Sequence, residues 1–166
     1  MKNTTASRIT ALLATSLAIA LGGCSSNQQN DSFVSWDQIN QEYLDTVASY
    51  PYKLPPGATF PSDLGEPEYA KEVYQPGFGA MQAYFFAQCA EEKVVVANHS
   101  SHKATAVAAL DAIDQIHQLP VFQKHVDDSG GEWKGIMDKA RLGDYSQLVN
   151  FYNSDCASPW YHDNGA

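Results

Sequence analysis

Positive charge is scarce in this sequence. Lys and Arg together number 10 against 19 Asp and Glu residues, and the 166-residue chain has a formal net charge of −9 at pH 7. Binding to nucleic acids draws much of its affinity from cations that neutralise phosphates. A chain with this balance has no basic face to offer, so we expect no nucleic acid among its partners. The length suits a single domain.

Common catalytic motifs are also absent. The sequence contains neither Gly-x-Ser-x-Gly nor His-Glu-x-x-His. Gly77 and Gly79 precede an expected helix, as in a phosphate-binding turn, but Gln82 occupies the third glycine position and no strand is expected before them. A dinucleotide site is therefore excluded. The sequence favours a protein that is not an enzyme and that carries no cofactor.

An apolar run without any charge occurs at the N-terminus. Residues 9–21 are apolar except for three hydroxyl side chains, and the cations Lys2 and Arg8 precede them. This pattern is typical of a secretory signal. Thirteen residues of helix span about 20 Å, which is less than the roughly 30 Å hydrocarbon core of a bilayer. We therefore do not expect a permanent transmembrane helix here.

The run ends in Leu21-Gly22-Gly23-Cys24, with Leu three residues before Cys and small residues directly before it. In this the leader resembles the bacterial lipoprotein precursors, whose lipobox has the same arrangement. The resemblance implies a diacylglyceryl group on Cys24, removal of residues 1–23, and a mature chain anchored by its lipid to the outer side of a bacterial cell membrane. Two acyl chains suffice for stable anchoring. The alternative is an ordinary signal peptide followed by a chance cysteine.

Removal of the leader makes the chain more acidic. It takes away Lys2 and Arg8 but no acidic residue, so the net charge falls from −9 to −11. We expect such a domain to stand off anionic lipid head groups. Residues 24–34 combine the lipidated cysteine with a polar stretch that is too poor in apolar residues to order itself, and we expect a flexible tether. Residues 35–166 then form a single domain.

Two cysteines remain once Cys24 carries lipid. Exported chains reach compartments where disulfides persist, so we expect Cys89 to pair with Cys156. The bridge would close a loop of 67 residues and contribute roughly 4 kcal/mol in the chain-entropy model. Two buried free thiols are the alternative. A catalytic Cys89 is disfavoured because apolar neighbours raise the pKa of a thiol.

The pattern of apolar residues predicts an all-α domain of four or five helices. Apolar side chains recur at spacings of three or four, and no alternating pattern exceeds a few residues. Ser35 and Gln38 form a capping-box pattern before the first such segment, and Pro51 ends it. Residues 50–61 contain four prolines and predict an extended wrap.

Further helices are predicted downstream. The segment 78–98 would be the central helix, although Val94, Val95 and Val96 would also suit a strand. Other segments with helical spacing, the first of them short, lie at 67–74, 101–119, 133–140 and 145–152. Pro120 would end one of these helices, Ser129 with Glu132 and also Asp144 would cap others, and Gly143 would follow a helix C-terminus.

Histidines provide the nearest approach to a metal site. His99 and His102 are spaced i, i+3 at an expected helix start, and His125, Asp127 or Asp128 could add a third ligand. Two histidines alone do not make a site. We expect solvated loop histidines and keep a metal-binding lipoprotein as an alternative.

A single Asp114-x-x-His117 sequence resembles half of a di-iron motif. The di-iron bundles need this motif twice, together with two further Glu-bearing helices. We therefore expect His117 to be a hydrogen-bonded core residue.

Aromatic side chains are abundant, with nine Tyr, seven Phe and three Trp. Most, including Trp36, lie at helical core spacings. Tyr50 and Tyr52 in the wrap, and Trp160 and Tyr161 in the C-terminal tail, are candidates for ligand binding, because aromatic residues exposed on loops are good anchors. The alternative is that the wrap simply covers the core.

Together these features predict a lipid-anchored extracytoplasmic module that binds another envelope protein or a ligand. The membrane is expected as a partner only through the lipid on Cys24. A metal-binding lipoprotein and a cell-envelope hydrolase with an unrecognised motif are the alternatives. Nothing in the sequence specifies the ligand.

Overall fold

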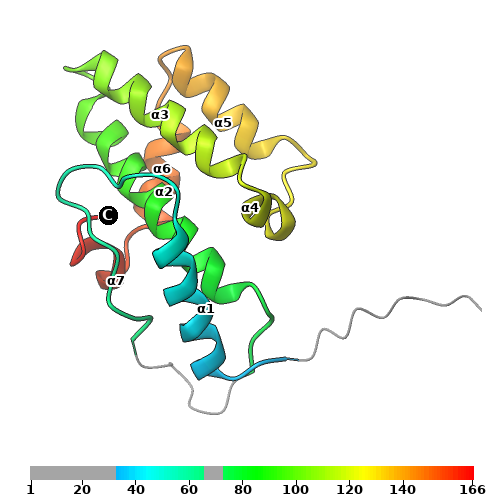
Figure 1. Cartoon of the computed structure of the whole chain (residues 1–166). Helices are drawn as coiled ribbons and strands as arrows, with labels where there is room; N and C mark the ends of the chain where they lie inside the picture. The colour runs from blue at the N-terminus through cyan, green and yellow to red at the C-terminus, as the bar shows by residue number, and fades with distance from the viewer. Residues whose placement is uncertain (1–32, 66–72) are drawn as a thin grey trace, which may run out of the picture. The chain divides into compact units, whose positions relative to one another are not determined.

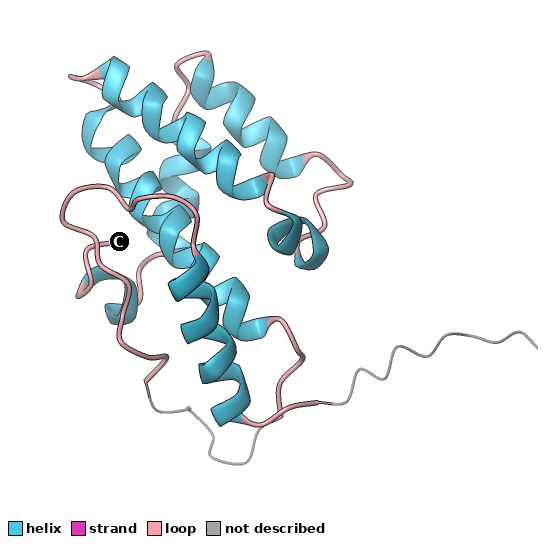
Figure 2. Ribbon diagram, in the orientation of Figure 1, coloured by secondary structure: helices cyan, strands magenta, loops and turns pink. Residues whose placement is uncertain are grey.

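The computed structural model describes residues 33–65 and 73–166, which belong to one compact unit. Within these ranges the secondary structure is helical, and the predicted all-α class is confirmed (Figure 2). The predicted leader, Cys24 and most of the tether lie outside the described residues. The helices are α1 (Trp36–Ser49), α2 (Phe78–Asn98), α3 (Lys103–His117), α4 (Pro120–His125), α5 (Glu132–Arg141), α6 (Ser146–Asp155) and α7 (Pro159–His162).

Helix α2 is the centre of the unit. It packs against α1, α3, α4, α6 and α7, and these helices surround it (Figure 1). Its 21 residues include twelve that are buried. A helix that is apolar on every side needs cover on every side. The composition of α2 therefore dictates a central position, and Val94, Val95 and Val96 are helical and not extended.

Helix α1 begins and ends as its sequence predicts. Ser35 Oγ accepts the backbone N–H of Gln38 at 3.4 Å, and Gln38 Oε1 accepts the backbone N–H of Ser35 at 2.9 Å. These two bonds satisfy orphan donors at the start of the helix. The helix ends at Ser49, two residues before Pro51.

A carboxylate from α1 caps the start of α2. Glu42 accepts the backbone N–H of Gly77 at 2.8 Å through Oε1 and that of Gly79 at 3.1 Å through Oε2. The negative charge is favourable beside the positive end of the helix dipole. Gly77 has a φ of 100°, in the left-handed region that favours glycine. Two helices separated by a long loop are thereby locked in one arrangement.

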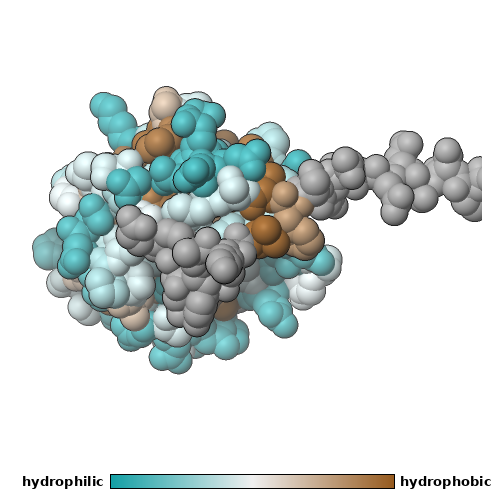
Figure 3. All heavy atoms as spheres, turned by 90° about the horizontal axis from the view of Figure 1, so that it is seen from below, coloured by the Kyte–Doolittle hydropathy of each residue, from teal (hydrophilic) through white to brown (hydrophobic). Residues whose placement is uncertain are grey.

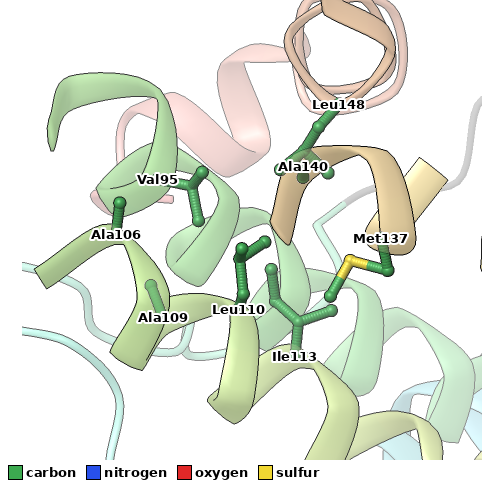
Figure 4. Packing of buried hydrophobic residues seen from close by; sticks show 8 residues of the cluster. All are labelled: Val95, Ala106, Ala109, Leu110, Ile113, Met137, Ala140 and Leu148. Atoms are coloured by element: carbon green, nitrogen blue, oxygen red, sulfur yellow. The ribbon is translucent and has the colours of Figure 1, made fainter. Parts of the chain in front are cut away.

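The main apolar cluster joins α2 and α3 to α5 and α6 (Figure 4). Its eight buried members come from all four helices, and Leu110 and Ile113 of α3 lie between α2 and α5. Small residues such as Ala106 and Ala140 allow the helices to approach closely. The eight are Val95, Ala106, Ala109, Leu110, Ile113, Met137, Ala140 and Leu148.

The proline-rich stretch runs over this bundle without forming a helix, as predicted. Phe60 packs on Phe86 of α2 at a ring distance of 5.3 Å, and Tyr50 packs on Phe60 at 5.2 Å. Tyr43 of α1 donates its hydroxyl to the carbonyl of Pro61 at 2.8 Å. The wrap therefore covers apolar core residues and is itself hydrogen-bonded to α1.

Cys89 and Cys156 lie at disulfide-bonding distance, with their Sγ atoms 2.06 Å apart. Cys89 belongs to α2, and Cys156 directly follows α6. The pairing expected from the cysteine count is therefore the one observed. It fixes the last turn of α6 to the central helix.

The structure contains two short helices that the sequence did not predict. Pro120 does not only follow α3 but begins α4, and Pro159 begins α7. Proline suits the first position of a helix because its missing N–H would be unbonded there in any case. The predicted number of four or five helices falls short because these two short helices have no apolar periodicity. The predicted helix at 67–74 lies mostly outside the described residues, and Tyr74 pairs in an isolated bridge with Val34.

The predicted caps of α5 and α6 also differ from the structure. The residue before α5 is Gly131, and the carboxylate of Asp128, not Ser129, accepts the backbone N–H groups of Trp133 and Lys134 at 2.9 and 3.2 Å. A carboxylate reaches further than a hydroxyl, so it can bond from a residue earlier in the chain. Helix α6 begins at Ser146, one residue later than predicted. The carboxylate of Asp144 accepts the backbone N–H of Ser146.

Among the described residues, no helix is both long and apolar enough to cross a membrane.

Candidate functional site

An aromatic cleft lies where the beginnings of α1 and α2 meet α7. It has a volume of about 300 Å³. Its walls come from four stretches of chain that are distant in sequence. They are the first turn of α1, the loop before residue 66, the start of α2 together with Tyr74, and α7 together with Ser158. The lining residues are Trp36, Leu64, Tyr74, Phe78, Gln82, Ser158, Trp160 and Tyr161. We call this site the aromatic cleft.

Both tryptophans of the aromatic cleft are held by the same loop. Trp36 Nε1 donates to the carbonyl of Gly65 at 3.2 Å, and Trp160 Nε1 donates to the carbonyl of Asp63 at 3.3 Å. The loop is itself bonded to α1, because Asn40 Oδ1 accepts the backbone N–H of Leu64 at 2.9 Å. The two indole rings are therefore oriented before any ligand arrives, and preorganisation of this kind lowers the cost of binding.

The aromatic rings of the cleft contact one another in two groups, one on each side. Trp36 lies 5.2 Å from Tyr74, and Tyr74 lies 5.4 Å from Phe78, measured between ring centroids. Across the cleft, Trp160 and Tyr161 meet edge to face at 5.0 Å. Each distance falls within the range in which aromatic pairs attract one another. Trp160 and Tyr161 also pack on Phe86 of α2, so these two rings are partly covered by the core.

Two polar side chains meet in the aromatic cleft. The hydroxyl of Tyr161 donates to Gln82 Oε1 at 3.5 Å, which is long for such a bond. Burial raises the pKa of Tyr161 to about 12, so its hydroxyl stays protonated and can both donate and accept. Among the described residues that line the aromatic cleft, none carries a charge.

Local sequence explains how α7 reaches the aromatic cleft. Cys156 is bonded to α2, and three residues later Pro159 starts the short helix that carries Trp160 and Tyr161. Asn164 then donates its side-chain amide to the carbonyl of Trp160 at 2.9 Å. The disulfide and this bond hold both aromatic residues against the start of α2.

Apolar side chains also reach the surface close to where the described chain begins. Phe33 and Val73 are each 61% exposed, and they flank the hydrogen-bonded pair formed by Val34 and Tyr74. Figure 3 views the molecule from the side on which α1 begins and shows hydrophobic surface among hydrophilic residues there. The aromatic cleft therefore has an apolar border on the side of Tyr74.

A second polar feature is a chain of three side chains inside the bundle, of which Gln88 and Glu92 are buried and His117 is half-buried. Gln88 Nε2 donates to Glu92 Oε1 at 2.7 Å, and His117 Nε2 lies 2.8 Å from Gln88 Oε1. Because the amide oxygen can only accept, His117 carries its proton on Nε2. We call Glu92, Gln88 and His117 the buried polar chain.

Desolvation shifts the pKa values at both ends of the buried polar chain. Burial raises the pKa of Glu92 to about 8 and lowers that of His117 to about 4. Both groups are therefore neutral at pH 7. His117 also lies between the rings of Phe122 and Trp133, at 4.1 and 4.9 Å. The predicted core histidine with a hydrogen-bond partner is what the structure shows.

Charged side chains line a groove of about 590 Å³ beside His117, and several already have partners. Arg141 forms ion pairs with Asp111 and Asp114, and Lys134 pairs with Asp138. The groove therefore provides few charges that are not already compensated.

The histidines considered as metal ligands each have another contact. His99 at the end of α2 lies 4.8 Å from the ring of Tyr145, and His102 Nδ1 bonds Ser101 Oγ at 2.9 Å. Within the described part of the chain, the one group of three candidate ligands close together is Cys89, Glu92 and Cys156. Its two sulfurs are bonded to each other, so neither is a thiolate that could bind a metal.

The four aromatic candidates fall into two pairs. Tyr50 belongs to the core, where it contacts Phe60 and Tyr84, and Tyr52 lies against it at 5.9 Å. Trp160 and Tyr161 line the aromatic cleft. Sequence reasoning thus identified one wall of the cleft.

The opposite wall was missed. Trp36 was assigned to the core by its helical spacing, whereas the structure places it half-buried in the aromatic cleft. Phe78 is 39% exposed. Both are the first residue of their helix. Position at a helix start is the signal that could have identified them, since no preceding turn covers the side chain.

Comparison with known proteins finds no matching family, no matching curated protein and no matching solved structure. The site is therefore interpreted from its own geometry.

Proposed function

We propose that this protein is a lipid-anchored extracytoplasmic binding module whose ligand site is the aromatic cleft. The observation that carries the proposal is the convergence of five aromatic rings from distant parts of the chain around one open hollow whose described lining residues carry no charge. Binding sites are concave, mostly apolar, and contain a few placed polar groups. The anchor is expected from the lipobox resemblance at Cys24, and the polar residues after it would act as the tether.

The arrangement favours binding over catalysis. Gln82 and Ser158 are the polar lining residues besides the tyrosines, and neither is a nucleophile paired with a base among the described residues of the cleft. Within the described lining, the raised pKa of Tyr161 keeps its hydroxyl protonated, and the carboxyl and imidazole groups of Glu92 and His117 lie outside the cleft, in the buried polar chain. A rigid aromatic surface without an acid or base is suited to holding a ligand.

Photocrosslinking in intact cells tests this proposal. Ser158 is an exposed lining residue of the aromatic cleft, so a photoreactive amino acid placed there should form an adduct with whatever occupies it. The matched control is the same amino acid at Gln147, which is exposed on α6 and does not line the cleft. We expect adducts from position 158 that weaken at least fivefold when Phe78→Ala is added. Equal adduct yields from both positions would contradict the proposal.

A further inference from the structure

We infer that the ligand of the aromatic cleft is an uncharged sugar of one or two rings. This inference rests on the proposed function and specifies the class of its ligand. It follows from three properties of the cleft: the uncharged character of its described lining residues, the prior use of both indole N–H groups, and the kind of polar groups that remain.

The uncharged character of the described lining residues disfavours ionic ligands first. The chain as a whole has a net charge of −9, yet among the described lining residues of the cleft none is charged. An ionic group that enters such a site loses water and finds no counter-charge, and this costs several kcal/mol. A neutral ligand avoids that cost.

The hydrogen bonds of the tryptophans then distinguish between neutral ligands. A peptide strand brings backbone carbonyl groups that need donors. The indole N–H groups of Trp36 and Trp160 already bond the carbonyls of Gly65 and Asp63. What the indoles could still offer a ligand is the part of each ring that its contacts with neighbouring aromatic rings leave uncovered. The electron-rich face of an aromatic ring attracts C–H groups, and a pyranose ring has one face that consists largely of C–H groups.

The remaining polar groups match hydroxyl chemistry. Ser158 and Tyr161 offer hydroxyls and Gln82 offers an amide, so each can donate one hydrogen bond and accept another. A sugar hydroxyl also donates and accepts. The long 3.5 Å contact between Tyr161 and Gln82 leaves room for a better partner. A hydroxyl placed beside this pair, within reach of each, would bond both.

The volume limits the size of the ligand. At about 300 Å³, the cleft lies at the small end of the range for ligand sites, which is roughly 300–1,000 Å³. One or two sugar rings fit such a space. A longer glycan would place its other residues outside, along the apolar border formed by Phe33 and Val73.

An array of neutral and acidic oligosaccharides, probed with the purified full-length protein, tests the inference. We expect retention on one or more neutral glycans, and at least tenfold weaker retention on acidic glycans of the same linkage. The hit is then titrated as a free disaccharide by tryptophan fluorescence, since Trp36 and Trp160 line the cleft.

The two decisive variants are matched. Phe78 and Tyr52 are each 39% exposed, and each contacts one neighbouring tyrosine ring at 5.4 and 5.9 Å. Phe78 lines the cleft and Tyr52 does not. We expect Phe78→Ala to weaken the disaccharide at least tenfold and Tyr52→Ala to change its affinity by less than twofold. Both variants should keep the melting curve of the parent within a few degrees.

The outcomes separate this inference from the proposed function. Absence of any neutral glycan among the hits overturns the sugar inference. A proline-rich peptide that binds with the same dependence on Phe78 also overturns it, but leaves the binding module standing. Equal loss of affinity in Phe78→Ala and Tyr52→Ala would place sugar binding outside the cleft. The proposed function fails separately if photocrosslinking at Ser158 gives no more adduct than at Gln147.

Discussion

Glu92 is a carboxylic acid without access to solvent. Its side chain is fully buried on α2, where Gln88 donates to one oxygen and the other lies 3.5 Å from the Sγ of Cys156. A disulfide sulfur has no proton, so a hydrogen bond in this contact would require the protonated form of Glu92. Burial raises the pKa of Glu92 to about 8. The neutral acid is therefore the form that the fold accommodates at pH 7.

The buried acid predicts a definite pH dependence of stability. Between pH 4.5 and about 8, the unfolded chain has released the Glu92 proton while the folded chain retains it. The free energy of unfolding therefore decreases as pH rises through this window. Glu92→Gln mimics the protonated acid and should remove the part of this decrease that Glu92 causes. At pH 8 we expect the free energy of unfolding of the variant to exceed that of the parent by on the order of 3 kcal/mol.

Urea unfolding under non-reducing conditions, at pH 5 and pH 8, measures this effect. Glu132→Gln is the control, because Glu132 is exposed at the start of α5. The free energy of unfolding of Glu132→Gln should differ little from that of the parent, and by a similar amount at both pH values. Glu91 has a pKa raised to about 7 by burial and adds to the same slope, so part of the slope should remain in Glu92→Gln. If Glu92→Gln and the parent differ in free energy of unfolding by the same amount at pH 5 and pH 8, the raised pKa assigned to Glu92 is contradicted.

His117 contributes to stability at the opposite end of the pH range. Burial lowers its pKa to about 4, so folding favours the neutral ring. Its stabilising contribution is present above the unfolded pKa near 6.5 and is lost as pH falls towards 4. Its contact with Gln88 Oε1 needs only the proton on Nε2. The opposite shifts of Glu92 and His117 place the stability maximum of this fold in mildly acidic solution.

At the scale of elements, the crossing of α1 and α2 depends on one glycine. Gly79 is buried, and a Cβ built there would overlap the backbone carbonyl oxygen of Ile39. The same turn of α2 receives the Glu42 cap from α1. The close approach at Gly79 is what lets a carboxylate on one helix reach the N–H groups of the next.

A pair of glycine substitutions measures this contact. Gly79→Ala should destabilise the fold by roughly 2–4 kcal/mol, because the backbone of α1 must move away. Gly135→Ala is the matched control, since Gly135 lies inside α5 and a Cβ added there would point into open space. The control should stabilise by about 0.5–1 kcal/mol through helix propensity. Thermal unfolding followed by circular dichroism distinguishes them, and a stable Gly79→Ala would refute the close approach.

The two short helices show how little sequence signal an element needs. Helix α7 has four residues and α4 has six, and each starts with proline. At this length no apolar periodicity can develop. The disulfide at Cys156 holds α7 in place, and the contact of Phe122 with His117 holds α4. Tertiary contacts stabilise both, and they therefore escaped prediction.

At the scale of the whole molecule, the Cys89–Cys156 bond closes a loop of 67 residues. In the chain-entropy model such a loop contributes about 4 kcal/mol. The bond also determines where the C-terminal residues lie. Ala166 is fully buried in the cluster that includes both cysteines, and Lys93 donates to the carbonyl of Gly165 at 3.2 Å. The tail that carries Trp160 is therefore part of the core.

The proposed anchor makes its own prediction for the whole chain. Cells expressing the parent and fed a palmitate analogue should label this protein, and Cys24→Ala should abolish the label, because lipid transfer needs that thiol. A variant with Cys89→Ala and Cys156→Ala keeps Cys24 and should remain labelled if it accumulates. Cell fractionation should move the Cys24→Ala protein out of the membrane fraction. Label that persists in Cys24→Ala would contradict lipidation at this position.

Helix positions and the disulfide could be predicted from sequence because their causes are local or countable. The capping box at Ser35, the apolar composition of α2 and the presence of only two cysteines after Cys24 each act without knowledge of the rest of the fold. The cap supplied by Asp128 could not be predicted, since a carboxylate can bond from several positions.

The sequence by itself determined the helical class, the central position of α2, the Cys89–Cys156 pairing and the expectation of an anchor at Cys24. Only the tertiary structure decided where a ligand could bind. The aromatic cleft joins Trp36 and Trp160, which are far apart along the chain but are held by one loop. Periodicity reports which face of a helix is buried. It cannot report which helix ends meet, because that depends on how α1, α2 and α7 pack together.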